Sequence, residues 1–439
     1  MAENNKGLMR RIGDTLRDWG PFRRDFWYSP IRGPWLTSFF SLMLLIVLPI
    51  VFITGLIDHV AWNPALGGTN NRTPDMGLLG FLTGLEWPTR PIWLYRLTEG
   101  IHVVLGISLI PLVFAKLWSI MPSLYKWPLA DSVGQALERL SILFLIGGIL
   151  FQMFTGLLYI QNFVIINNFK FNQLHFYSNW IFIAGLVLHV LVKFPVMVEG
   201  LRARGVRNEL QKSLSETEPE PREEGRLVST DPAPPTISRR GAIAVVAGSS
   251  LTMFALAIGQ TLGQRWSWLA ILSPRAQSPG EGPNDFRVNK TAEKAGISPE
   301  QVGPGWRLEL VGNTHQMLSR EDLLAMPLYT SSLPIACLEG WSTGNQDWEG
   351  IRMRDLADLA GMPNAEKVLF ESLESTDAVA RMAFMRRNQF QDPLSLLALR
   401  VNGVDLSLDH GYPARAIVPA TPGNRNTKWI YRMTFMEEV

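Results

Sequence analysis

Long apolar runs without a charged side chain occupy much of the first 264 positions of the chain. About 20 apolar residues are enough for a helix to cross the hydrocarbon core of a bilayer. We therefore predict five transmembrane helices, rather than buried core helices, in runs 33–57, 100–115, 140–169, 171–192 and 241–264. The second run is short, and it continues past Lys116 if that side chain extends to the membrane surface.

The pattern changes after residue 284 to short strand-like segments separated by Gly, Pro and Asn. A helical spacing of apolar residues in "MRDLADLAGM" interrupts them, with Gly361 near its end. We predict an α+β domain over residues 284–439, which is long enough to have its own core. The predicted strands are "WRLEL", "SSLPIACL", "KVLFES", "LLALRVNG", "ARAIVPA" and "WIYRMTF".

Lysine and arginine are concentrated at one end of the predicted helices. They are frequent in residues 1–34 and 201–238 and scarce between the first two helices. The positive-inside rule predicts that both segments are cytoplasmic, at an inner membrane. The fifth helix then runs outward, and residues 284–439 lie on the extracytoplasmic side.

Residues 201–238 are rich in Pro, Glu, Ser and Thr, which predicts a disordered linker. The linker leads into "SRRGAIAVVAGSS", in which Arg239 and Arg240 open the fifth helix, 239–264. This sequence resembles a twin-arginine export signal placed inside a chain. The resemblance implies export of a folded, cofactor-loaded domain. The alternative is that the two arginines only hold the cytoplasmic end of the helix.

Overall charge and cysteine content add two observations. The formal net charge is +2, which gives no indication of nucleic-acid binding. Cys337 is the one cysteine in the chain, so an intrachain disulfide is excluded. The membrane lipid is the partner that the composition itself indicates.

Four histidines lie in the predicted membrane part: His59, His102, His175 and His189. His175 and His189 are separated by about 21 Å on one face of the fourth helix. The predicted topology places His102 and His175 at a similar outer depth on two helices. Intramembrane histidines are functional hypotheses by default, and bundle cores commonly hold cofactors. A hydrogen-bonded structural role is the alternative for each.

Residues 35–200 resemble the membrane cytochrome b subunits of formate dehydrogenase and nickel–iron hydrogenase. The resemblance implies a four-helix haem bundle that exchanges electrons with quinone. His102 and His175 would then bind an outer haem b, and His189 an inner one. The first helix has no histidine at its inner end, so His59 is the alternative partner. The number of haems, one or two, stays open.

The C-terminal domain resembles the molybdopterin-binding domain of the sulfite oxidase superfamily, in "CLEGWS", "DWEGIRMRDLADLAG" and "GYPARAIVPATPGNRNTKWIYRMTF". The resemblance implies that Cys337 is the catalytic cysteine and binds molybdenum, and a soft thiolate suits this metal. It also implies contacts to the molybdopterin-type cofactor. The expected cofactor-binding residues are Arg415, Asn424, Arg425, Lys428 and His410.

The residues after Cys337 bear on the substrate. "CLEGWS" lacks the arginines that follow the cysteine in sulfite oxidases, and it is closer to periplasmic molybdoenzymes that act on sulfoxides. We therefore expect an S- or N-oxide substrate, such as protein methionine sulfoxide. The alternatives are a sulfite dehydrogenase that uses Arg386 or Arg387, and a haem b electron carrier whose outer domain binds no cofactor.

Overall fold

The computed structural model describes residues 29–62, 86–125, 133–161, 165–166, 169–220, 233–273, 282–376 and 381–437. Most of the expected N-terminal segment 1–34 lies outside these residues. The chain divides into two compact units. The first comprises Met1–Ile50 and Leu105–Phe254, and the second comprises Val51–Val104 and Ala255–Val439.

Among the described residues, five helical spans are long and apolar enough to cross a membrane, as the sequence predicted. Large apolar side chains such as Phe144 and Leu188 are exposed on them, which suits contact with lipid. The second span is longer than expected, because it includes two consecutive helices. The helices are α2 (Pro34–Trp62), α3 (Leu94–Ser108), α4 (Ile110–Leu124), α5 (Val133–Ile160), α6 (Phe171–Arg204) and α8 (Arg239–Leu262).

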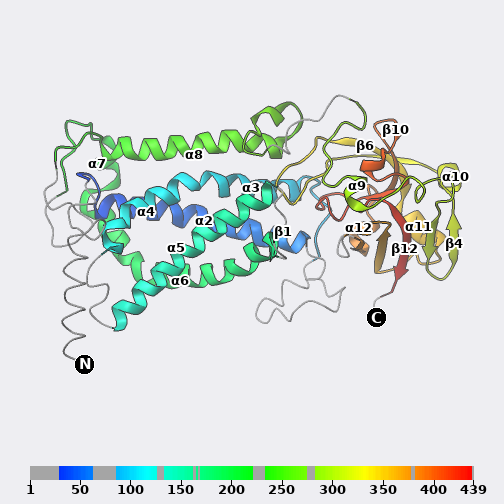
Figure 1. The fold of residues 1–439 in the computed structure, drawn as a ribbon, viewed down its shortest axis with the longest axis horizontal. Coiled ribbons are helices and arrows are strands. Elements are labelled where there is room, and N and C mark those ends of the chain that lie inside the picture. The colour runs from blue at the N-terminus through cyan, green and yellow to red at the C-terminus, as the bar shows by residue number, and fades with distance from the viewer. Residues whose placement is uncertain are drawn as a thin grey trace. The chain divides into compact units, whose positions relative to one another are not determined.

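In the first unit, α5 and α6 lie side by side (Figure 1). The run 140–169 was expected to be one helix, but α5 ends at Ile160. The short strands β1 (Ile165–Ile166) and β2 (Phe169–Lys170) pair before α6 begins. The run is uncharged, but after Ile160 it contains Asn162, Asn167 and Asn168, a residue type that favours turns over helices, which explains the difference.

Part of the segment expected to be a disordered linker is ordered. Residues 201–204 complete α6, and α7 (Val206–Gln211) follows. Arg239 is fully buried and binds two carboxylates, Glu209 at 2.8 Å and Glu220 at 2.5 Å. Arg204 also binds Glu220, at 3.2 Å. Charge pairing therefore orders residues that have too few apolar side chains to form a core.

The described residues of the second unit form two five-stranded sheets, which confirms the predicted α+β domain. One has the order β10-β9-β6-β5, with β11 also paired to β9, and the other has the order β4-β3-β12-β7-β8. Strand β12 runs parallel to β3 and antiparallel to β7. The strands are β3 (Leu308–Val311), β4 (His315–Leu318), β5 (Tyr329–Leu333), β6 (Gln346–Arg352), β7 (Lys367–Ser372), β8 (Met382–Arg386), β9 (Leu396–Val401), β10 (Val404–Asp405), β11 (Arg415–Ile417) and β12 (Ile430–Met436).

Short helices connect these strands. The predicted helix is α11 (Met353–Leu359), whose buried Met353 and Leu356 join a core built from both sheets. Gly361 follows with φ +71°, a conformation that glycine adopts without strain. The others are η4 (Gln264–Leu269), α9 (Ala292–Ala295), α10 (Arg320–Ala325), α12 (Arg387–Phe390) and η6 (Leu408–His410).

Candidate functional site

Cys337 lies in the loop between β5 and β6. Its backbone N–H donates to the carbonyl oxygen of Trp341 at 2.8 Å, and the N–H of Gly340 donates back to Cys337 at 3.0 Å. Gly340 has φ +81°, and the bridge between Ala336 and Ser342 closes the loop. These backbone contacts fix the direction of the Cys337 side chain.

The surroundings of Cys337 are buried and include the charged side chain of Glu339, and the guanidinium of Arg287 lies 5.3 Å from the ring centroid of Trp341. Cys337 packs with Ala270 and Trp341, and all three are buried. The indole Nε1 of Trp341 donates to Oε2 of the buried Glu339 at 2.7 Å. Glu339 and Trp341 therefore form one hydrogen-bonded pair within the cysteine loop.

The loop 418–428 lies directly beside the cysteine loop. The N–H of Gly423 donates to the carbonyl oxygen of Ala336 at 2.6 Å, and Pro422 forms a bridge with Ala336. Trp87, which precedes α3, donates from Nε1 to the carbonyl oxygen of Ala420 at 2.6 Å. Cys337 and the expected cofactor-binding residues of this loop are thus brought together by the tertiary structure.

Three buried cations of this region bind backbone carbonyl oxygens. Arg415 donates to His410 at 3.0 Å and to Asn426 at 3.1 Å. Arg425 donates to Phe384 at 2.5 Å, and Lys428 donates to Asp409 at 3.0 Å. Among the described residues, the Nε atoms of Arg415 and Arg425 have no hydrogen-bond partner. Buried positive charge of this kind suits an anionic ligand.

The pKa values reflect the cost of burying this charge. Burial lowers the pKa of Arg415 to about 9 and that of Arg425 to about 10, and Arg386 contributes to the second shift. Burial, followed by the charge of Arg415, holds the pKa of Lys428 well below its usual value. A bound phosphate would stabilise the charged forms of all three side chains.

His410 has a structural role beside these cations. Its Nε2 lies 2.8 Å from the carbonyl oxygen of Asn284, which can only accept, so Nε2 carries the proton. The ring stacks on Phe286 with 3.7 Å between centroids. Burial, followed by the charge of Arg415, lowers the pKa of His410 to about 4, so the ring is neutral at pH 7.

The remaining expected residues are more scattered. Asn424 is exposed, whereas its neighbour Asn426 is buried and accepts from the N–H of Val418 at 2.8 Å. Arg387 binds Glu366 at 2.9 Å, with both side chains partly in solvent. Arg386 lies close enough to Arg425 to affect its pKa.

The residues present fit a molybdopterin cofactor. The described residues contain no group of three or more His, Cys, Asp or Glu side chains able to hold a metal ion. A metal bound by Cys337 therefore needs most of its ligands from another molecule, which a dithiolene provides. The unsatisfied guanidinium nitrogens and the buried Lys428 suit the phosphate of that molecule.

Several polar residues near the site carry no recognisable motif and were not predicted. Gln260 and Thr261 at the end of α8 bind the cysteine loop through Ser342 and Gly340. Trp87 contacts the loop 418–428 from outside the domain predicted at 284–439. A sequence pattern gives no signal for contacts between segments this far apart in the chain.

The histidines of the helices divide between the two units. His59 and His102 lie in the second unit, and His175 and His189 in the first. Nδ1 of His102 lies 2.8 Å from the carbonyl oxygen of Val51, and Nδ1 of His175 lies 3.0 Å from Oγ1 of Thr155. His315, outside the helices, is exposed and binds Glu309 at 3.0 Å.

Comparisons with known proteins agree with the C-terminal site. Residues 295–439 match the family described as oxidoreductase molybdopterin binding domain. An uncharacterized oxidoreductase YuiH from Bacillus subtilis is 32% identical over 136 residues, 30% of this chain and 66% of that protein. Human mitochondrial sulfite oxidase is 31% identical over 160 residues, which is 30% of this chain and 29% of that enzyme.

Solved structures also match, and one of them is a sulfane dehydrogenase. The sulfane dehydrogenase SoxCD from Paracoccus pantotrophus is 26% identical, over 31% of this chain and 39% of that chain, with a TM-score of 0.27. The chain thus spans less than two thirds of the length of each of these relatives. Residues 295–439 are therefore similar to the molybdopterin-binding domains of sulfite oxidase-type oxidoreductases.

Proposed function

We propose that this chain is a membrane-anchored molybdenum oxidoreductase that exchanges electrons between quinone and an outer molybdenum site through haem b. One observation carries the proposal. A Cβ atom on Gly340 would lie 2.8 Å from the side chain of Val103, so the cysteine loop contacts the turn of α3 that bears His102. A haem ligand and the metal-binding cysteine are then linked by a short path within one compact unit.

The hydrogen bonds of His102 and His175 support haem ligation. The carbonyl of Val51 can only accept, so Nδ1 of His102 donates and Nε2 bears the lone pair. The hydroxyl of Thr155 donates to the carbonyl of Phe151 at 2.8 Å, so it accepts from Nδ1 of His175. In both residues Nε2 is the basic nitrogen, and an oriented Nδ1–H is typical of metal-bound histidine.

Each of these two rings also lies against a glycine of the neighbouring helix. A Cβ atom on Gly55 would lie 2.4 Å from Cε1 of His102, and one on Gly156 would lie 3.3 Å from Cε1 of His175. Glycine at both places lets each imidazole lie close to the backbone of the neighbouring helix within its own unit. His189 and His59 stay proposals for a second haem, with the sequence alone as support.

A groove in the first unit supports quinone binding. It has a volume of about 720 Å³ and is lined mainly by apolar side chains, among them Phe40, Phe114 and Trp118. Ser29 and Ser249 add hydroxyl groups. Apolar cavities of this size with a few polar groups are typical sites for small organic ligands.

The residues of the outer domain have separate roles in the proposed reaction. The Cys337 thiolate binds the metal, Arg415, Arg425 and Lys428 bind the cofactor's phosphate, and Trp341 with Ala270 excludes water from Cys337. The bound molybdenum cofactor would supply oxygen-atom transfer. In the reductive direction, two electrons and two protons convert an S-oxide to the sulfide and water, or an N-oxide to the amine and water.

The absence of arginine from the cysteine loop itself supports an S- or N-oxide substrate, either a small molecule or a protein sulfoxide. A sulfite dehydrogenase that passes electrons to quinone is the second proposal. The proximity of Arg386 to Arg425 favours it, because paired guanidinium groups suit an oxyanion. Reduction of methionine sulfoxide and oxidation of sulfite, assayed on the same preparation, distinguish the two.

The location also remains a proposal. Five apolar helices are compatible with a membrane protein. We place the molybdenum domain on the extracytoplasmic side of the inner membrane because of the basic flanks of these helices. The paired Arg239 and Arg240 would then serve as an export signal.

The first test is the molybdenum and iron content of the full-length protein purified in detergent. We expect one molybdenum per chain and one or two irons with a b-type haem spectrum. Cys337→Ser should abolish oxidoreductase activity and leave the haem spectrum unchanged. Iron without molybdenum, from a host that makes the cofactor, would reject the catalytic proposal and favour an electron carrier with an outer binding domain.

A further inference from the structure

The C-terminal end of α8 is hydrogen-bonded to the loop that carries Cys337. The N–H of Ser342 donates to the carbonyl oxygen of Gln260 at 2.8 Å. The Ser342 hydroxyl donates to the carbonyl oxygen of Thr261 at 2.6 Å. The Thr261 hydroxyl in turn donates to the carbonyl oxygen of Gly340 at 3.1 Å. Three hydrogen bonds therefore join the helix end to both sides of the cysteine loop.

Helix α3 holds the same end of α8. Arg96 donates to the carbonyl oxygen of Thr261 at 2.7 Å and also to that of Leu262. These are among the last carbonyl groups of the helix, which have no partner within it. Gly100 leaves room for the Thr261 side chain, because a Cβ atom there would lie 2.3 Å from Cγ2 of Thr261. Arg96 therefore caps the C-terminal end of α8.

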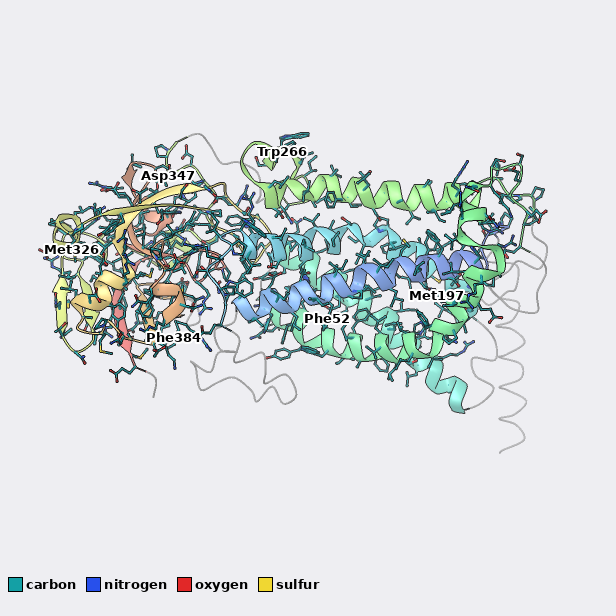
Figure 2. The ribbon with its side chains drawn as sticks, turned by 180° about the vertical axis from the view of Figure 1, so that it is seen from behind. Phe52, Met197, Trp266, Met326, Asp347 and Phe384 are labelled. Atoms are coloured by element: carbon teal, nitrogen blue, oxygen red, sulfur yellow. The ribbon has the colours of Figure 1, made fainter. Side chains whose placement is uncertain are left out.

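The chain then folds back from α8 over Cys337. Gly263, with φ +61°, turns the chain into η4, where Trp266 is labelled in Figure 2. The η4 backbone packs on Gly259, where a Cβ atom would lie 2.2 Å from the carbonyl oxygen of Trp266. This reversal places the fully buried Ala270 against Cys337 and Trp341.

Gln260 adds a second and independent indication. Its side chain is fully buried, and neither its amide oxygen nor its amide nitrogen has a hydrogen-bond partner among the described residues. An unsatisfied buried amide is costly and indicates a bound group. Its backbone carbonyl binds the cysteine loop, so this amide belongs to the same region of the molecule.

We propose that the segment Gln260–Ala270 is a permanent part of the molybdenum site, which positions the Cys337 loop and covers its thiol. The part concerning molybdenum rests on the proposed function, whereas the covering of the thiol does not. Helix α8 is then more than an anchor or a removable export signal, and the mature protein retains it. Thr261 and Gly259 are positioning residues in this arrangement.

Cys337 is the one cysteine of the chain, so thiol labelling reports on this residue alone. The test uses full-length protein in detergent, made in a host that lacks molybdopterin synthesis, and measures the rate of maleimide labelling. Thr261→Val removes the hydrogen bond to Gly340 and should label about five-fold faster than wild type. Thr261→Ser keeps the hydroxyl and should label at close to the wild-type rate.

Glycine substitutions in α8 provide a matched pair. Gly259→Ala displaces the η4 backbone and should raise the labelling rate about ten-fold or more. Gly248→Ala on the same helix meets nothing within 4 Å and should leave the rate unchanged, as should Thr252→Val, whose hydroxyl binds only within α8 in the described structure. Unchanged rates for both Thr261→Val and Gly259→Ala would overturn the proposal.

A second measurement in a cofactor-producing host separates this proposal from the proposed function. Thr261→Val should change the electron paramagnetic resonance signal of molybdenum(V), while the control Thr252→Val should not. If the labelling results hold but no molybdenum is bound, the proposed function fails and the covering role of α8 stands. If molybdenum is bound and neither the labelling rate nor the signal changes, the positioning role is wrong and the enzyme assignment stands.

Discussion

Arg425 donates from Nη1 to the carbonyl oxygen of Ala61, 3.3 Å away. Ala61 lies in the last turns of α2, and Arg425 lies in the loop beside Cys337. The same guanidinium donates to Phe384 and has no partner for Nε among the described residues. The buried side chain of Arg425 therefore links the end of α2 to the loop 418–428, and its Nε–H is a donor that a ligand could use.

Replacing Arg425 should reduce cofactor retention. In Arg425→Met we expect about 10-fold to 100-fold weaker retention, because charge-assisted hydrogen bonds contribute about 1.5–3 kcal/mol each. Molybdenum per chain after gel filtration measures the effect. Arg387→Met is the control, since Arg387 binds Glu366 at the surface. Equal molybdenum content in both variants would argue against a phosphate contact by Arg425.

Lys428 should lower the stability of the cofactor-free protein and strengthen binding of the cofactor. Its pKa is well below the usual value of 10.5, so the unfolded chain binds more protons between the two pKa values. Stability of the cofactor-free chain should therefore fall as the pH decreases through that window. Lys428→Met should remove this dependence, raise the melting temperature at neutral pH, and lower the molybdenum content. The exposed Lys294→Met should change neither quantity.

His410 should make the cofactor-free protein sensitive to acid. Its folded-state pKa of about 4 lies below the unfolded value of 6.5, so stability is lost as the pH falls from about 6.5 to 4. The full effect is about 3 kcal/mol. His410→Gln keeps a donor for Asn284 and should flatten the pH dependence of the melting temperature. His315→Gln, at an exposed site, should retain the wild-type profile.

Alanine at Gly55 should impair the outer haem site. The new methyl group would lie 2.4 Å from the present position of Cε1 of His102 and would displace the ring. We therefore expect loss of most haem b. Gly156→Ala meets His175 at 3.3 Å and should have a smaller effect. The ratio of haem to protein and the reduced-state spectrum measure both. Gly106→Ala, which meets nothing within 4 Å, should retain full haem, and equal loss in all three variants would contradict the prediction.

Substitutions of Arg239 and Arg240 distinguish a structural role of the pair from a role in export. Arg239 is buried between two carboxylates, so Arg239→Gln should destabilise the first unit by about 3–5 kcal/mol. Arg240 is exposed, so Arg240→Gln should leave the melting temperature unchanged. If the pair is also an export signal, Arg240→Gln should block export although stability is unchanged. The outer domain would then stay in the cytoplasm and be protected from protease added to spheroplasts. Normal export of this variant would leave only the structural role.

The sequence alone determined the elements whose signal is local. Uncharged runs are long enough to span a bilayer, and β-branched residues between glycine and proline breakers gave the strands of the outer domain. The resemblance of local motifs to a known family also predicted Cys337, Arg415, Arg425 and Lys428 as site residues. The end of the uncharged run 140–169 was misread as helix, because the absence of charge does not by itself distinguish a helix from the paired strands β1 and β2 that form there.

The tertiary structure decided what joins distant segments. Glu209 and Glu220 are ordinary linker carboxylates in the sequence, and they become ordered because Arg239 lies between them. Thr261 is one threonine in an apolar helix, and its role follows from Gly340, 79 positions away. Such contacts depend on how the chain folds back on itself. Burial then makes the hydrogen bonds and ion pairs of these polar groups stronger than the same interactions in water.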